Sequence, residues 1–196
     1  MLASISPLGE RARGNRWGLT VAAFAAGSVV GAAFLGGVLG EAGAWLARTG
    51  SARWAVAIIA VLAGVWDLAG PGRIPGVRRQ VDERWLSRYR GWVYGAGFGV
   101  QLGVGVATIV STASVYAWMA AAVMVRDPAA GSVVGACFGL SRAAMIGAVR
   151  NVDDPSRLRA RLRTLAGWSR RARLGAGAAS VAVGAGCAAI AATGIR

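Results

Sequence analysis

The segment Gly97–Tyr116 reads GFGVQLGVGVATIVSTASVY and lies inside an apolar run, residues 92–125, that contains no charged residue. As a single α-helix this run would be about 51 Å long, whereas the hydrocarbon core of a bilayer is about 30 Å thick. The run is rich in glycine, and glycine with nearby hydroxyl groups is typical of kinked or discontinuous membrane helices. We therefore expect it to cross a membrane and favour a bend between Gly103 and Ser111. A long, tilted helix is the alternative.

The composition indicates the same class of protein. Of the 196 residues, 56% are hydrophobic and only 15% are charged, which is too apolar for an ordinary soluble domain. Abundant glycine and alanine favour close contact between helices in lipid. The sequence therefore predicts an all-α, polytopic transmembrane helical bundle that forms a single integral membrane domain over residues 1–196.

Five apolar runs are long enough to be candidate membrane spans, since about 20 helical residues cross the bilayer core. Arginines lie mainly before the first run (three), after the second (six) and after the fourth (eight), and only four lie on the opposite side. The positive-inside rule then places the N-terminus in the cytoplasm. The predicted spans are residues 17–47, 54–70, 92–125, 129–149 and 174–195.

The third run carries polar side chains where lipid contact would be unfavourable. On a helix, Gln101, Thr108, Ser111 and Thr112 lie on one face, and apolar side chains lie opposite. Unpaired amides and hydroxyls are costly in hydrocarbon, so this face should contact another helix or a wet cavity. Hydroxyls can bond to their own backbone, but Gln101 has no such local partner. Both alternatives, a permeation path and polar contacts between helices, remain open.

Three charged residues lie inside the predicted spans, and one of them, Glu41, is near the outer end of the first span. Arg142 is about two turns from the cytoplasmic end of the fourth span, and Asp67 is near the cytoplasmic end of the second. We consider an Asp67–Arg142 ion pair, with separate snorkelling of each charge to the headgroups as the alternative. The complete candidate set for a substrate or ion path is Gln101, Thr108, Ser111, Thr112, Arg142 and Asp67.

An octet is repeated with one difference. GSVVGAAF at Gly27–Phe34 recurs as GSVVGACF at Gly131–Phe138, in spans predicted to run in opposite directions. Antiparallel internal symmetry is one explanation. We favour the simpler one, in which G-x-x-x-G contact faces recur in helices rich in glycine, alanine and valine.

The stretch GFGVQLGVGVATIVSTASVYA, followed by GACFGLSRA, resembles the second half of small membrane proteins in the superfamily of CcdA/DsbD thiol carriers and LysE-type exporters. The resemblance covers about residues 92–150. It implies three-helix repeats with a broken leading helix. The thiol carriers have a Pro-Cys element in that helix, and Val110–Thr112 contains neither residue. Thiol-disulfide exchange through this element is therefore only a remote alternative.

Two arginine-rich loops have amphipathic patterns. VRRQVDERWLSRYR (Val77–Arg90) and SRLRARLRTLAGWSRRAR (Ser156–Arg173) each place an apolar stripe between arginines, and Asp154 with Pro155 marks a helix start. Both are predicted to be interfacial helices at the cytoplasmic leaflet, attracted to anionic lipid headgroups. The apolar stripes argue against nucleic acid as a partner.

The chain lacks histidine, a nucleotide-binding loop and a metal-ligand cluster, so we expect neither an enzyme nor a bound cofactor or metal. The best prediction is a small transporter or exporter-like protein, in a bacterial cytoplasmic membrane, with a polar site on the third span. The alternative is a non-catalytic scaffold or accessory subunit, which would act as a homo-oligomer or within a larger membrane complex.

Overall fold

In the computed structural model, residues 5–46, 52–70, 84–105, 114–150, 152 and 154–193 are described, and they contain helices and connections without any β-strand. The chain is thus all-helical over this part, as predicted. The helices are α1 (Pro7–Ala12), α2 (Trp17–Leu46), α3 (Ala52–Ala69), α4 (Trp85–Arg88), α5 (Gly91–Val104), α6 (Ser114–Val125), α7 (Pro128–Ala144), the 3-10 helix η2 (Met145–Val149) and α8 (Pro155–Thr193).

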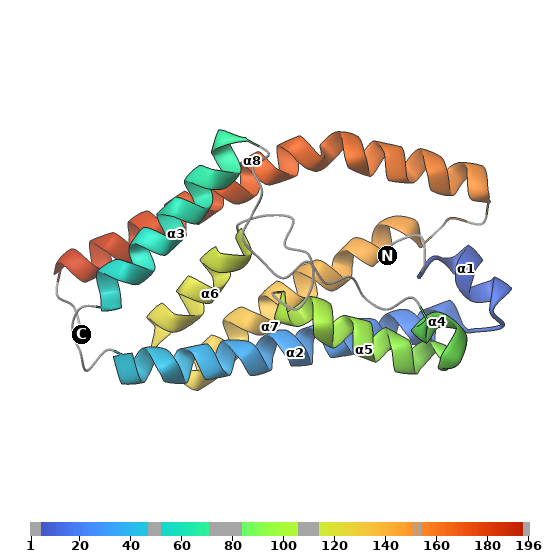
Figure 1. Cartoon of the computed structure of the whole chain (residues 1–196), viewed down its shortest axis with the longest axis horizontal. Coiled ribbons are helices and arrows are strands. Elements are labelled where there is room, and N and C mark those ends of the chain that lie inside the picture. The colour runs from blue at the N-terminus through green and yellow to red at the C-terminus, as the bar shows by residue number, and fades with distance from the viewer. Residues whose placement is uncertain are drawn as a thin grey trace.

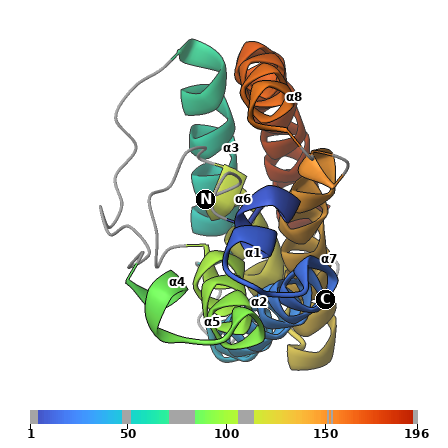
Figure 2. The same cartoon turned by 90° about the vertical axis from the view of Figure 1, so that its right-hand side faces the viewer.

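The long helices run alternately along the long axis of the molecule. In Figure 1, α2, α5 and α8 run from the right-hand end toward the left, whereas α3 and α7 run from left to right. α6 continues in the direction of α5. Viewed from the right-hand end in Figure 2, α2, α5 and α7 lie together, and α3 stands beside α8 above them. α6 contacts α2, α3, α7 and α8 and so connects the two groups.

Glycine allows α2 to pack directly on the backbones of α5 and α7. A Cβ atom added to Gly31 would lie 2.8 Å from the Val100 carbonyl oxygen of α5, and one added to Gly95 would lie 2.6 Å from that of Thr20. On the other side of α2, Gly131 and Gly135 face the backbone at Gly36 and Ala32. The G-x-x-x-G elements are therefore contact faces, as favoured from the sequence.

The two copies of the repeated octet pack differently. Gly27 and Gly31 of the first copy face α5, whereas Gly131 and Gly135 of the second face α2. α3 and α8 form a separate close pair, in which Gly64 and Gly177 face each other's carbonyl oxygens.

Among the described residues, three helical segments are long and apolar enough to cross a membrane, namely Trp17–Leu46, Pro128–Val149 and Pro155–Ala189. This finding is consistent with an integral membrane protein. The second predicted span corresponds to α3, and shorter apolar helical segments among the described residues are Ala57–Ala69 of α3 and Val115–Val125 of α6. Five crossings with a cytoplasmic N-terminus therefore remain a prediction.

The third apolar run is not one helix, and α5 ends where the bend was favoured. Val104 is its last residue, and Gly105 follows with φ +77°, a conformation that favours glycine. The next described helix, α6, begins at Ser114. The first run, by contrast, forms one continuous helix, α2. Its glycines lie in the contacts of α2 with α5 and α7.

Of the interfacial helix predicted over 77–90, residues 77–83 lie outside the described part, and α4 covers Trp85–Arg88. α4 ends at Arg88, and Tyr89 has an extended backbone. Trp85 stacks on Phe98 of α5, with ring centroids 6.1 Å apart. Trp85 of the predicted apolar stripe therefore packs on α5.

The predicted helix over 156–173 forms but is not separate from the fifth span, which corrects the prediction. α8 runs without interruption through both segments, and the helix continues from Arg173 directly into Leu174. Its start was predicted correctly. Asp154 accepts hydrogen bonds from the backbone N–H groups of Ser156 and Arg157, at 2.8 and 3.2 Å.

Candidate functional site

Gly105, which follows the last residue of α5, lies against α6 and α7. A Cβ atom at Gly105 would lie 3.2 Å from Cγ1 of Val115 and 3.4 Å from Cε1 of Phe138. Gly105 is itself buried. The described start of the break, Gly105, therefore lies beside the first turn of α6 and the middle of α7.

Phe138 brings a tryptophan and an arginine together beside this break. The Trp118 ring of α6 stacks on Phe138 with centroids 4.7 Å apart, and Cζ of Arg142 lies 5.5 Å from the Phe138 centroid. The Trp118 indole Nε1 is buried and has no hydrogen-bond acceptor among the described residues. An unpaired buried donor costs about 1–3 kcal/mol, so an acceptor at this place would stabilise the site.

Arg142 is half-buried and forms no ion pair with any acidic residue in the described part of the chain. The hypothesis of an Asp67–Arg142 ion pair is therefore not realised in the structure. Asp67 is buried on α3 and packs against α8. A Cβ atom added to Gly177 of α8 would lie 3.2 Å from the Cβ atom of Asp67. The two charges belong to different helix packings, α3 on α8 for Asp67 and α7 on α2 for Arg142.

Gln101 lies one turn before the break and is half-buried, and no hydrogen bond joins its amide to another described residue. Thr108, Ser111 and Thr112 lie outside the described residues. Of the six candidates, Gln101 and Arg142 are therefore the two that the structure places on helices at the break. Asp67 is not part of this group.

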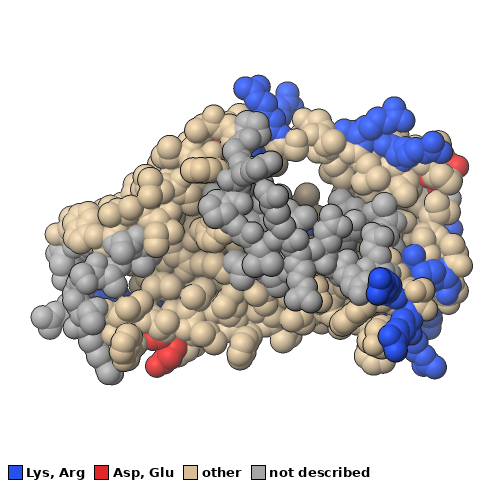
Figure 3. Space-filling view, in the orientation of Figure 1, with Lys and Arg blue, Asp and Glu red and all other residues tan. Residues whose placement is uncertain are grey.

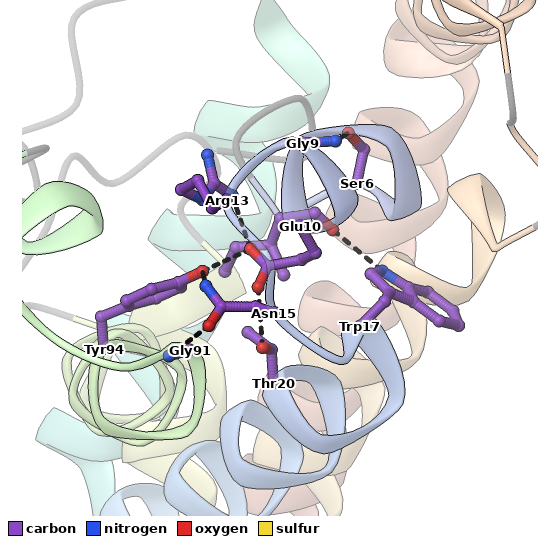
Figure 4. A network of polar contacts seen from close by, with 10 residues as sticks. Ser6, Gly9, Glu10, Arg13, Asn15, Trp17, Thr20, Gly91 and Tyr94 are labelled. Carbon is purple, nitrogen blue, oxygen red and sulfur yellow. Dashed lines mark hydrogen bonds and ion pairs between the residues drawn. The ribbon is translucent and has the colours of Figure 1, made fainter.

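A second polar cluster, at the arginine-rich end of the molecule, was missed from the sequence (Figure 4). Its centre is Glu10 of α1, which is fully buried. The Glu10 carboxylate accepts hydrogen bonds from the Tyr94 hydroxyl at 2.5 Å and the Thr20 hydroxyl at 2.9 Å, and it pairs with Arg13 at 2.5 Å. This arrangement ties α1 to the first turns of α2 and α5.

Asn15 and Trp17 extend the cluster. The Asn15 amide donates to the Tyr94 hydroxyl at 3.2 Å, and its oxygen accepts from the Gly91 N–H at 3.4 Å. The Trp17 indole donates to the Ile5 carbonyl at 3.2 Å. Burial by itself lowers the pKa of the Arg13 guanidinium, but hydrogen bonds to Glu10 and Tyr94 outweigh it and raise that pKa. Arg13 therefore remains a cation that neutralises Glu10.

Only a weak signal for this cluster is present in the sequence. Glu10 is a lone acidic residue beside three arginines between positions 11 and 16, and the positive-inside rule considers only the arginines of such a pattern. Its partner Tyr94 is 84 positions away along the chain.

Cysteine and metal chemistry receive little support from the described residues. Cys137 and Cys187 are both free thiols, the first exposed and the second buried. No group of three or more His, Cys, Asp or Glu side chains in the described part is placed to hold a metal ion.

Comparison of the chain with protein-family models, with curated proteins and with solved structures finds no match.

Proposed function

We propose that the protein is a small transporter of an anionic solute in the bacterial cytoplasmic membrane, with its binding site at the break between α5 and α6. The observation that carries this proposal is Arg142. This arginine is half-buried in a candidate membrane span and has no acidic partner among the described residues. Charged groups inside a membrane are costly and usually serve a substrate or ion path.

Two further donors support an anion at the same place. The Trp118 indole N–H is buried without an acceptor in the described structure, and the Gln101 amide is half-buried one turn before Gly105. A carboxylate or phosphate oxygen would accept hydrogen bonds from such groups, and the guanidinium would balance its charge. Discontinuous helices are a recurrent way of forming substrate sites near the middle of the bilayer.

Thermal unfolding of the purified protein in detergent tests the proposal. The probes are sulfate, phosphate, acetate and glutamate salts, with lysine hydrochloride as the cationic counterpart. We expect at least one anion to raise the unfolding temperature, because saturation at 100 times Kd stabilises the folded state by about 2.7 kcal/mol. The shift should vanish in Arg142→Gln and persist in Arg150→Gln, a control at an exposed position just beyond η2. A shift that survives in Arg142→Gln would contradict the proposal.

A scaffold or accessory subunit is the second candidate, and the packing of α2 favours it. At Gly27, Gly31, Gly36 and Gly40, α2 is in direct backbone contact with α5 or α7 or the residues just before α7, which leaves no room for a wet path at these positions. Large apolar side chains such as Phe34 and Trp45 are exposed elsewhere on α2, as expected for contact with lipid or a neighbouring subunit. A scaffold predicts no anion-dependent shift in any variant.

A further inference from the structure

A cavity of about 330 Å³ lies at the arginine-rich end, between the first turns of α2 and α5. Arg16 and Leu19 line it from the α2 side, and Arg90 and Trp92 line it from the α5 side. Its volume is at the lower end of the range for small-ligand sites. It is distinct from the break at Gly105, which lies at the opposite end of α5.

The Glu10 cluster holds the two sides of this cavity together. Asn15 lines the cavity and joins α2 to α5 through its hydrogen bonds with Gly91 and Tyr94. Gly91 fits this contact because a Cβ there would lie 3.1 Å from the Asn15 Cγ atom and still closer to the Thr20 hydroxyl. The distance between the backbone segments that hold Arg16 and Arg90 is therefore fixed before any ligand binds.

The cavity has an uncompensated positive charge. Neither the Arg16 nor the Arg90 guanidinium takes part in an ion pair or hydrogen bond with another described residue. Glu10, the acid of the neighbouring cluster, is fully buried and already paired with Arg13. Figure 3 shows that basic side chains gather at this end of the molecule. Two guanidinium groups at one concave site match the geometry and charge of a phosphate group.

The lining of the cavity also includes two large apolar side chains. Leu19 and Trp92 lie in the first turns of α2 and α5, and they are 54% and 50% exposed. A free phosphate ion has no apolar part that could contact these two side chains. Tryptophan and arginine together at the end of an apolar helix are typical of the membrane interface, where a lipid phosphate lies beside the beginning of its acyl chains.

We propose that this cavity binds one anionic phospholipid, with its phosphate between Arg16 and Arg90 and its acyl chains along Leu19 and Trp92. The bound lipid bridges α2 and α5 at the arginine-rich surface of the membrane. This site goes beyond the proposed transport site, and its test does not depend on transport.

Native mass spectrometry of the purified protein in detergent tests this proposal. Phosphatidylglycerol and phosphatidylcholine are titrated in parallel, and glycerol 3-phosphate and inorganic phosphate serve as competitors without acyl chains. The variants are Arg16→Gln/Arg90→Gln and a control with the same change in charge, Arg157→Gln/Arg161→Gln, at two exposed positions on α8.

We expect one phosphatidylglycerol to bind more tightly than phosphatidylcholine. The double change at Arg16 and Arg90 should raise its Kd about tenfold or more, and each single change about threefold, while the α8 control stays near the wild-type value. If the double variant does not fold, the two single variants decide the result. An equal loss in the α8 control would overturn the proposal, because it would indicate general charge attraction. Displacement of the lipid by millimolar glycerol 3-phosphate or inorganic phosphate would also overturn it, since the site would then take phosphate without acyl chains.

Discussion

Gly31→Ala tests the direct backbone packing of α2 on α5. The added methyl group would lie 2.8 Å from the Val100 carbonyl oxygen and 3.0 Å from its Cα, whereas ordinary contacts begin at 3.4 Å. The two backbones must therefore separate locally by about 0.6 Å. Overpacking of this kind costs about 1–3 kcal/mol, and a gap of that size weakens the dispersion attraction of neighbouring contacts by about a quarter.

Alanine also has the higher helix propensity, which offsets about 1 kcal/mol of that cost. We expect Gly31→Ala to lower the free energy of unfolding by up to about 2 kcal/mol, as measured by circular dichroism in mixed micelles with increasing sodium dodecyl sulfate. Gly18→Ala on the same helix is the control, because no atom lies within 4 Å of the Cβ position there. The free energy of unfolding of Gly18→Ala should equal that of the wild type or be slightly higher. Equal stability of the two variants would refute the reasoning.

Two further predictions concern the polar contacts at helix ends. Tyr94→Phe removes a hydrogen bond from the buried Glu10 carboxylate and should destabilise the protein by about 1–3 kcal/mol in the same assay, whereas Tyr89→Phe, at an exposed position, should not. Hydrogen bonds from the Ser156 side chain and from backbone N–H groups hold the pKa of Asp154 below its ordinary value of 3.8. The cap at the start of α8 should therefore be intact at neutral pH and lost only as the pH falls through that lowered pKa. A carboxyl-carbon NMR titration of Asp154 with a midpoint above 3.8 would contradict this second prediction.

Features set by neighbouring residues in the chain were accessible from the sequence. The end of α5 at Val104 follows from a glycine-rich segment too long for a bilayer, and the start of α8 follows from Asp154 and Pro155. The G-x-x-x-G contact faces could be predicted for the same reason, although the sequence did not indicate which helix each face would meet.

Features set by tertiary packing were not accessible. The stacking of Trp85 on Phe98 joins α4 to α5, and a helical pattern does not encode this contact. The cluster around Glu10 depends on Tyr94, whose position is fixed by the packing of α5 on α2. Asp67 and Arg142 looked like a pair because their predicted depths matched, but depth does not determine which helices are neighbours.

Accessibility of position 101 to water is the most direct test of a polar path at the break between α5 and α6. Gln101→Cys and Val100→Cys are introduced separately into a Cys137→Ser/Cys187→Ser background and reconstituted in liposomes. Val100 is the matched control, because it is the adjacent residue and is exposed on the surface of the bundle. We predict that a membrane-impermeant methanethiosulfonate reagent modifies the cysteine at 101 and leaves the one at 100, facing acyl chains, unmodified. Absence of modification at 101 would contradict the account and leave a bundle held together by glycine contacts.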